Sequence, residues 1–216
     1  MKEAYIRFMA PILPQTSDEL FKIIDSRIAQ KYEKIHLMIS SPGGSVFHGI
    51  SIYNFLKGAP IEVETYNFGS VDSVGVVLFC AGKHRCSVPH ARFLIHGVRF
   101  NVGNPQSFDE KQLEEHLKGV RIDQTNIARI IADTSGKPLH KVEEDMNNRI
   151  TLSPTEAKDY GLVHDIKSSL FPIGAELSVI GEIAKTQQQG VPIPFGITVQ
   201  PVQAYTRSAD LDFQSF

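Results

Sequence analysis

The chain has 216 residues, of which 42% are hydrophobic and 21% charged, and its formal net charge is -2 at neutral pH. These values resemble those of ordinary globular proteins, so they exclude a chain that is disordered over most of its length. The near-neutral charge, with a sequence pI of about 6.4, gives no reason to expect nucleic acid or an anionic membrane as a partner.

Neither a targeting segment nor a disulfide framework is expected. The first residues, Met1 to Arg7, contain no apolar signal-peptide core, and no stretch approaches the ~20 apolar residues that span a bilayer. We therefore expect a cytoplasmic protein. The two cysteines, Cys80 and Cys86, are too few for a disulfide framework, and we expect small buried side chains.

The N-terminal part alternates between helical and extended patterns. Residues 16–19 have the spacing of a capping box, which predicts a helix that runs to about Gln30. The apolar run Ile35–Ile39 predicts a buried strand, and Ser45 is placed to cap a second helix. The sequence therefore begins with helix, strand, turn and helix.

The same alternation continues through the middle of the chain. Ile61–Thr65 alternates as a strand, Val74–Ala81 is an apolar helical segment closed by glycine, and Arg92–His96 predicts another strand. Phe108–Ile131 has the period of a long helix with a charged outer face, and its length suits an arm between subunits. Ser153 caps a short helix after it. The recurring order of strand and helix predicts a mainly parallel sheet.

The composition changes after Ile166, and we expect a domain boundary there. Residues 1–166 form the predicted main domain, and residues 167–216 form a C-terminal extension. Leu177, Ile180 and Ile183 predict one more helix, followed by a tail rich in glutamine and proline.

Three features carry the chemistry of acyl transfer. The turn Ser41-Pro42-Gly43-Gly44 joins a strand to a helix and leaves backbone N–H groups open to an anion. Ser73 begins an apolar helix, where the dipole favours a developing negative charge, and His96 ends an apolar strand. A tight structural turn, a helix-capping serine and a core histidine are the alternative interpretations. Because strand ends meet at one edge of a parallel sheet, we expect these features to form one site.

Two other kinds of site are not expected. The nucleophile motif of α/β-hydrolases requires glycine where this chain has Val71. His84, His90 and Cys86 are close in sequence but lie in a predicted strand edge and turn, so we expect no metal site, and the proposed chemistry needs no cofactor.

Four segments in order resemble the proteolytic subunit of the Clp protease (ClpP), a family of serine peptidases. They are SSPGGSVFHGISIY from Ser40, GSVDSVGVVLFCAG from Gly69, ARFLIH from Ala91 and LSPTEAKDYGLV from Leu152. The resemblance covers roughly 35–166. It implies an α/β fold of the crotonase/ClpP type, with repeated ββα units and a long handle helix.

The resemblance also implies roles for single residues. Ser73 matches the family nucleophile, His96 its base, and Gly44 and Val74 the residues whose N–H groups form the oxyanion hole. The helix from Phe108 lies where the family has the handle that stacks two heptameric rings. A ring-shaped homo-oligomer, a heptamer or tetradecamer, that hydrolyses peptides or unfolded proteins is therefore expected.

The chain departs from the family pattern at two places. The family has an aspartate just before its L-S-x-x-E-A segment, whereas an ungapped comparison places Arg149 there and one extra residue places Asn148 there. An asparagine oxygen can hold an imidazole in the required tautomer, so Asn148 is the candidate third member of the triad. Asp72 stands where the family prefers a small residue, and we expect its carboxylate to point away from Ser73.

The N-terminal region shows no counterpart of the family's ATPase-docking loop. We therefore expect a serine-type endopeptidase that is independent of a standard Clp ATPase. The alternative is a catalytically weak or inactive scaffold of the same fold, which Arg149 favours. An acyl-CoA enzyme of the wider crotonase superfamily gives no reason for Ser73 and His96, and it ranks last.

Overall fold

The computed structural model describes residues 2–99, 107–181 and 198–200. Its strands are β1 (Glu3–Met9), β2 (Lys34–Ser41), β3 (Glu62–Asp72), β4 (His84–Ser87), β5 (Arg92–Leu94), β6 (Thr151–Leu152), β7 (Asp165–Ile166), β8 (Leu177–Gly181) and β9 (Thr198–Gln200). Its helices are α1 (Pro14–Ala29), α2 (Val46–Gly58), α3 (Val74–Cys80), α4 (Glu110–Ser135), α5 (Leu139–Asn148) and α6 (Pro154–Tyr160).

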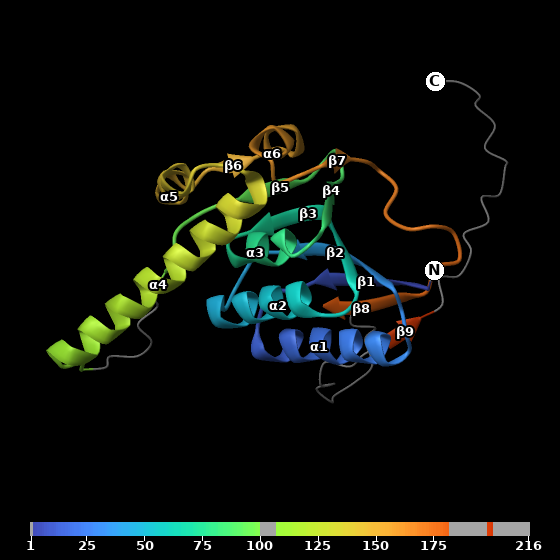
Figure 1. Cartoon of the computed structure of the whole chain (residues 1–216), viewed down its shortest axis with the longest axis horizontal. Coiled ribbons are helices and arrows are strands. Elements are labelled where there is room, and N and C mark those ends of the chain that lie inside the picture. Colours follow the sequence, from blue (N-terminus) through green and yellow to red (C-terminus); the bar gives the residue numbers. More distant parts are fainter. Residues whose placement is uncertain (1, 100–106, 182–197, 201–216) are drawn as a thin grey trace, which may run out of the picture.

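The strands form one sheet in the order β6-β5-β3-β2-β1-β8-β9, and β4 pairs with β3 and β7 beside this path. Every pair among them is parallel except β5–β6 and β8–β9. Helices α1 to α3 lie against the sheet, whereas α4 extends well beyond the body (Figure 1). The predicted α/β architecture with a mainly parallel sheet is therefore confirmed.

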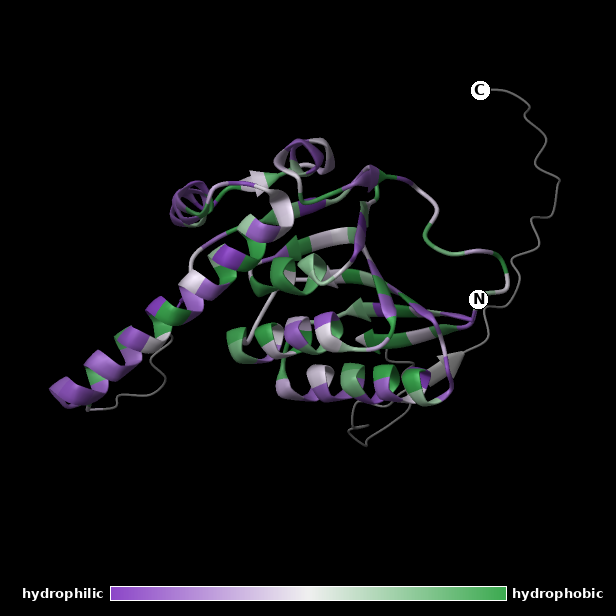
Figure 2. Ribbon diagram, in the orientation of Figure 1, coloured by the Kyte–Doolittle hydropathy of each residue, from purple (hydrophilic) through white to green (hydrophobic). Residues whose placement is uncertain are grey.

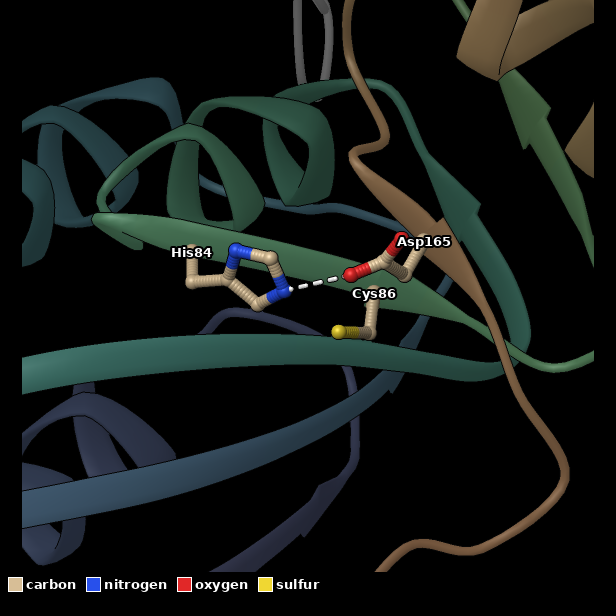
Figure 3. Close-up of side chains that lie close together, drawn as sticks. All are labelled: His84, Cys86 and Asp165. Carbon is tan, nitrogen blue, oxygen red and sulfur yellow. Dashed lines mark hydrogen bonds and ion pairs between the residues drawn. The ribbon is translucent and has the colours of Figure 1, made fainter.

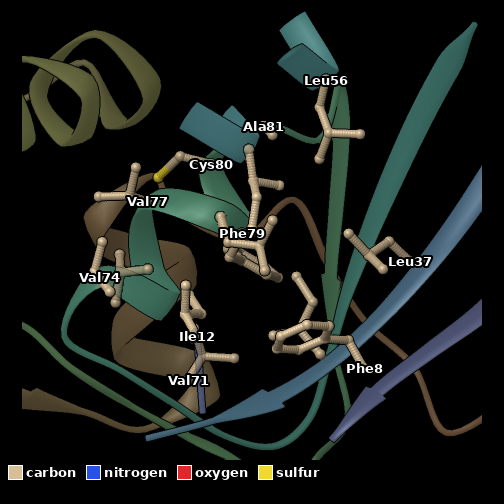
Figure 4. Close-up of a cluster of buried hydrophobic side chains, with 14 of the residues drawn as sticks. Phe8, Ile12, Leu37, Leu56, Val71, Val74, Val77, Phe79, Cys80 and Ala81 are labelled. Atoms are coloured by element: carbon tan, nitrogen blue, oxygen red, sulfur yellow. The ribbon is translucent and has the colours of Figure 1, made fainter. Parts of the chain in front are cut away.

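The main core lies between the sheet and the helices. Alternate residues of the central strands point into it, including Phe8 of β1 and Leu37 of β2, and both are fully buried (Figure 4). Helix α3 is buried over its whole length, which explains why its sequence is apolar all round. The longer helices instead have polar outer faces (Figure 2). This apolar packing fixes the strand ends that carry the candidate site.

The predicted C-terminal helix is wrong, because Leu177–Gly181 is the strand β8. It pairs in parallel with β1 from Tyr5↔Leu177 to Met9↔Gly181, and Ile180 is buried. Pairing with a neighbouring strand outweighs the weak helical spacing of three apolar residues. The third of them, Ile183, lies outside the described residues. The boundary after Ile166 stays a prediction.

Helix α1 begins two residues earlier than its predicted capping box. The hydroxyl of Thr16 accepts a hydrogen bond from the Leu13 N–H at 3.0 Å, so Thr16 lies inside the first turn and does not precede it. The helix starts at Pro14, whose ring favours the first helical position. Strand β1 and helix α5 were not predicted, and β3 continues to Asp72, well beyond the predicted end at Thr65.

One buried cation joins the ends of three helices. Arg85 of β4 is only 7% exposed, and none of the ion pairs among the described residues involves it. Its guanidinium donates to backbone carbonyls that follow or end α3, α4 and α6, namely those of Gly82, Thr134, Gly161 and Leu162. Positive charge is favourable at helix C-termini, so Arg85 ties this side of the fold together.

Substitution of Arg85 by methionine is expected to lower the free energy of unfolding by about 3 to 5 kcal/mol. Four backbone carbonyls would lose this donor at once, and the bonds to Gly82 and Leu162 are buried. Urea unfolding measures the change, with Arg129→Met as control because Arg129 is an exposed residue of α4. A loss below about 1 kcal/mol would show that these carbonyls do not depend on the guanidinium.

Candidate functional site

The glycine turn between β2 and α2 has a backbone that only glycine adopts easily. Gly43 has φ 87° and Gly44 has φ 147°, and a methyl group added to Gly44 would lie 2.3 Å from the Ile12 carbonyl oxygen. The Ile12 N–H donates to the Gly43 carbonyl at 2.8 Å, and the Ser45 N–H donates to the Ile12 carbonyl at 2.9 Å. These bonds attach the turn to the segment that follows β1.

The N–H of Gly44 is left free by this arrangement. The bridge between Ile12 and Gly44 uses the Gly43 carbonyl and the Ser45 N–H, so the Gly44 N–H points away from Ile12. Among the described residues no acceptor is found for it, nor for the N–H of Val74 at the start of α3. Two open donors therefore lie beside the end of β3.

Ser73 occupies a sharp turn between β3 and α3. Its backbone has φ 59° and ψ -131°, which is strained for any residue with a side chain, and its hydroxyl makes no capping hydrogen bond. The interpretation of Ser73 as an ordinary helix cap is therefore wrong. Nucleophilic serines of α/β-hydrolases lie on a strained strand-to-helix turn of this kind, although Val71 replaces their first glycine.

The structure brings Ser73 against the glycine turn. A methyl group added to Gly43 would lie 2.7 Å from the Ser73 Cβ and 3.2 Å from its Oγ. Ser73 also donates its N–H to the Leu94 carbonyl at 2.8 Å, which attaches it to the end of β5 just before His96. The glycine turn, Ser73 and the segment that leads to His96 thus lie along one edge of the sheet.

His96 is half-buried just beyond β5, which ends at Leu94 and not at His96 as predicted. Its Nδ1 lies 2.6 Å from the carbonyl oxygen of Gly97, so Nδ1 must carry the proton in this contact. The other ring nitrogen, Nε2, is then free to accept a proton. No side-chain hydrogen bond between Ser73 and His96 is found in the part of the chain that the structure describes.

Backbone hydrogen bonds attach both neighbours of His96 to the end of α5 and the turn that follows it. The Ile95 N–H donates to the Ile150 carbonyl at 2.9 Å, and the Gly97 N–H donates to the Met146 carbonyl at 3.0 Å. Asn148 lies between these two anchors, exposed at the end of α5, and no hydrogen bond joins it to His96 in the described structure. Its role as third member of the triad stays a prediction.

Asp145, the last acidic residue of α5, is already engaged in other contacts. Asp145 is 4% exposed, accepts a hydrogen bond from the Tyr160 hydroxyl at 2.9 Å and pairs with Lys141 at 2.8 Å. Burial, followed by the Asp145 contact, raises the pKa of Tyr160 well above its ordinary value. Arg149 follows α5 with φ 56° and is exposed. Neither residue offers His96 a carboxylate.

Asp72 faces away from the Ser73 site, as the sequence predicted. Its carboxylate accepts from the Ser70 hydroxyl at 2.8 Å and pairs with Arg92 at 2.8 Å. This pair borders a hollow of about 560 Å³, which Met9 and Pro42 also line. The hollow therefore lies beside the last residues of β3, and Ser73 itself does not line it.

The sequence model of the Clp protease family matches residues 1–169. The ATP-dependent Clp protease proteolytic subunit 3 of Rhodococcus jostii is 36% identical over 141 residues, which cover 64% of this chain and 68% of that protein. Proteolytic subunit 2 of Corynebacterium glutamicum is 34% identical over 134 residues, which cover 61% of this chain and 65% of that protein. Proteolytic subunit 1 of a Synechococcus species is 33% identical over 159 residues, which cover 70% of this chain and 78% of that protein.

Among solved structures, a ClpP1 mutant from Listeria monocytogenes superimposes with a TM-score of 0.68 at 25% sequence identity. The match covers 76% of this chain and 91% of that one. The sequence comparison and the structural comparison thus point to the same family. This protein belongs to the Clp protease family and has the ClpP/crotonase-like fold.

Proposed function

We propose that the protein is a serine-type endopeptidase in which Ser73 attacks the peptide carbonyl. The observation that carries this proposal is the strained backbone of Ser73, which makes no capping bond and lies against a glycine turn with open N–H groups. His96 takes the hydroxyl proton through Nε2 and later passes it to the leaving amine. The N–H groups of Gly44 and Val74 stabilise the oxyanion of the tetrahedral intermediate.

The Nδ1 proton of His96 has one observed acceptor and one proposed acceptor. The Gly97 carbonyl holds it in this structure at 2.6 Å, and the amide oxygen of Asn148 lies on the turn that brackets the ring. We propose that Asn148 takes over when substrate and neighbouring subunits order this turn. An amide oxygen keeps the imidazole in the right tautomer but stabilises imidazolium less than a carboxylate does, so turnover is expected to be slow.

Labelling with a fluorophosphonate tests the proposed function directly, because the probe reacts with activated serines. The wild-type protein should be labelled, whereas Ser73→Ala should show no labelling and His96→Ala should react much more slowly. Labelling that persists in Ser73→Ala would place the reactive group elsewhere. If wild type is not labelled either, the non-catalytic scaffold becomes the better description, and Arg149 in place of an acid favours that alternative.

Substitution of Gly43 by alanine is expected to lower the rate of peptide hydrolysis at least tenfold. The new methyl group would meet the Ser73 Cβ at 2.7 Å and the Asp72 carbonyl at 2.8 Å, and φ 87° is unfavourable for alanine. A displacement of about 1 Å in a nucleophile is enough to reduce turnover roughly 100-fold. Steady-state kinetics measure the effect. Gly119→Ala is the control, since nothing lies within 4 Å of its added methyl, and an equal effect there would contradict the argument.

The substrate is proposed to be an extended peptide or unfolded protein segment that lies beside the glycine turn and the residues after His96. Because Ser73 is half-buried and not enclosed, a short peptide can reach it without an unfolding enzyme. We therefore propose that the peptidase acts independently of a standard Clp ATPase, although the curated relatives are named as ATP-dependent proteases. Degradation of a folded substrate that requires ATP and such a partner would contradict this part of the proposal.

A ring-shaped homo-oligomer, a heptamer or tetradecamer, is proposed as the assembled form. Helix α4 projects from the body and carries Leu113, Leu117 and Ile122, each about half exposed (Figure 1). Leu113 and Leu117 lie one turn apart on the same face of this arm, and exposed apolar side chains there favour contact with another copy. Sedimentation velocity gives the mass. None of the described helices is both long and apolar enough to cross a membrane, and a cytoplasmic location stays a prediction.

A further inference from the structure

Strands β4 and β7 place three metal-ligating side chains on one face, away from the Ser73 site. His84 and Cys86 are two residues apart on β4, so their side chains point the same way, and Asp165 of β7 is the register partner of Cys86. The His84 Nε2 lies 2.9 Å from the Asp165 Oδ2 (Figure 3). Each donor atom of the three lies within 4.8 Å of the others.

We propose that His84, Cys86 and Asp165 bind a zinc ion. One imidazole nitrogen, one thiolate and one carboxylate are all ligands that zinc accepts, and three protein ligands leave a fourth position for water. Bond lengths of about 2.0 to 2.3 Å in a tetrahedron require the donor atoms to be roughly 3.3 to 3.8 Å apart. The printed separations run from 2.9 Å for His84 and Asp165 to at most 4.8 Å, so no pair has to change by more than about 1 Å to reach this range.

The surroundings are compatible with an ion that enters from solvent. The side chains of His84 and Asp165 are 38% and 55% exposed, whereas Cys86 is fully buried beneath them. The inner wall is apolar and includes Met38 and Tyr66, which shields a metal–thiolate bond from water. The ion would therefore enter past His84 and Asp165 and meet the sulfur at the base of the site.

Two nearby lysines carry positive charge that would repel a bound metal ion. Lys167 interacts with the Cys86 thiol and with the Tyr66 ring, and Lys158 lies 3.9 Å from the Asp165 Oδ1. Both lysines are exposed and can swing into solvent. In contrast, Cys86 and Asp165 are register partners in the β4–β7 pairing.

His164 does not complete the ligand set. Its ring stacks on His84 with 5.0 Å between centroids, but its Nδ1 accepts the Arg85 N–H at 3.0 Å and its Nε2 faces the Arg85 guanidinium at 3.2 Å. Both ring nitrogens are therefore engaged. The stacked ring instead covers one face of the His84 imidazole.

Zinc bound here would fix the short strand β7 to β4. β7 has only two residues and joins α6 to the segment that leads to β8. A ligand that binds only the folded state raises its stability, so zinc is expected to raise the melting temperature. The effect does not depend on peptidase activity.

Isothermal titration calorimetry of the untagged full-length protein with Zn²⁺, under reducing conditions, tests the proposal. One ion should bind per chain, and His84→Gln, Cys86→Ser and Asp165→Asn should each weaken binding about 10- to 100-fold or more. Co²⁺ is the second probe, since ligation by Cys86 should give a thiolate-to-cobalt charge-transfer band that is absent in Cys86→Ser. The bound protein should also melt at a higher temperature.

Matched controls distinguish this cluster from general metal affinity. Cys80→Ala removes the only other cysteine, and His90→Gln removes an exposed histidine just after β4. Both variants should bind zinc as wild type does. Equal affinity in wild type and His84→Gln, or a cobalt complex with no thiolate band, would overturn the proposal and leave His84–Asp165 as an ion pair alone. Circular dichroism confirms that each variant is folded.

Discussion

Substitution of Ser73 by alanine is expected to reduce kcat/KM for a short peptide by at least about 10³-fold. The hydroxyl oxygen is the proposed nucleophile, and no other hydroxyl occupies its place on the strained turn beside Gly43. Loss of a nucleophile removes the covalent route, which in serine proteases reduces turnover by as much as 10⁶-fold. Hydrolysis of a fluorogenic peptide by the assembled protein measures the change.

Ser70→Ala is the matched control for this experiment. Ser70 lies on the same strand and its hydroxyl binds Asp72, so its removal changes the hollow beside the end of β3 and leaves Ser73 in place. Its expected effect on kcat/KM is less than about tenfold. Both variants should retain the wild-type melting temperature to within a few degrees, because alanine keeps the same backbone strain at position 73. Equal activity of Ser73→Ala and wild type would exclude Ser73 as the nucleophile.

Asn148→Asp is expected to raise kcat/KM, on the order of 100-fold. A carboxylate at this position would attract the Nδ1 proton of His96 away from the Gly97 carbonyl and stabilise the imidazolium that forms when Ser73 attacks. The reverse exchange, from aspartate to asparagine, reduces a serine protease about 10⁴-fold, so a large gain is available. The same peptide assay measures it.

Asn147→Asp provides the control for charge alone. Asn147 is the neighbouring exposed residue of α5, and its side-chain oxygen lies 3.5 Å from the Gln124 amide nitrogen. The substitution adds an equal charge to the same turn but should change kcat/KM less than threefold. A gain in Asn147→Asp that equals the gain in Asn148→Asp would assign the effect to general electrostatics. No gain in Asn148→Asp would leave the Gly97 carbonyl as the group that orients His96.

Together these experiments separate two properties that the Clp protease fold combines. Ser73 and the glycine turn test whether chemistry occurs, whereas Asn148 tests how strongly His96 is assisted. A protein with Ser73-dependent labelling and slow turnover that Asn148→Asp restores would be a peptidase limited by its third residue. That outcome would exclude a pure scaffold.

Much of the fold could be predicted because its signals are local. The apolar run of β2 and the Ser153 cap of α6 depend on neighbours within a few residues, and the structure confirms both. Helix α4 was predicted from its periodicity, and Gly136 ends it with φ 73°. Strand β8 was mistaken for a helix because its partner, β1, is far away in the sequence.

By itself, the sequence determined the alternation of strand and helix and the identity of the groups that could do chemistry, since periodicity, caps and glycine turns act over short distances. Only the tertiary structure decided which groups meet. The strain of Ser73 arises where β3, β5 and the glycine turn converge, and the Nδ1 contact of His96 with Gly97 depends on anchors at Met146 and Ile150. His84, Cys86 and Asp165 become neighbours only because β4 pairs with β7. His84 and Asp165 are 81 residues apart in the sequence, and pairing over such a distance leaves no local pattern in the chain.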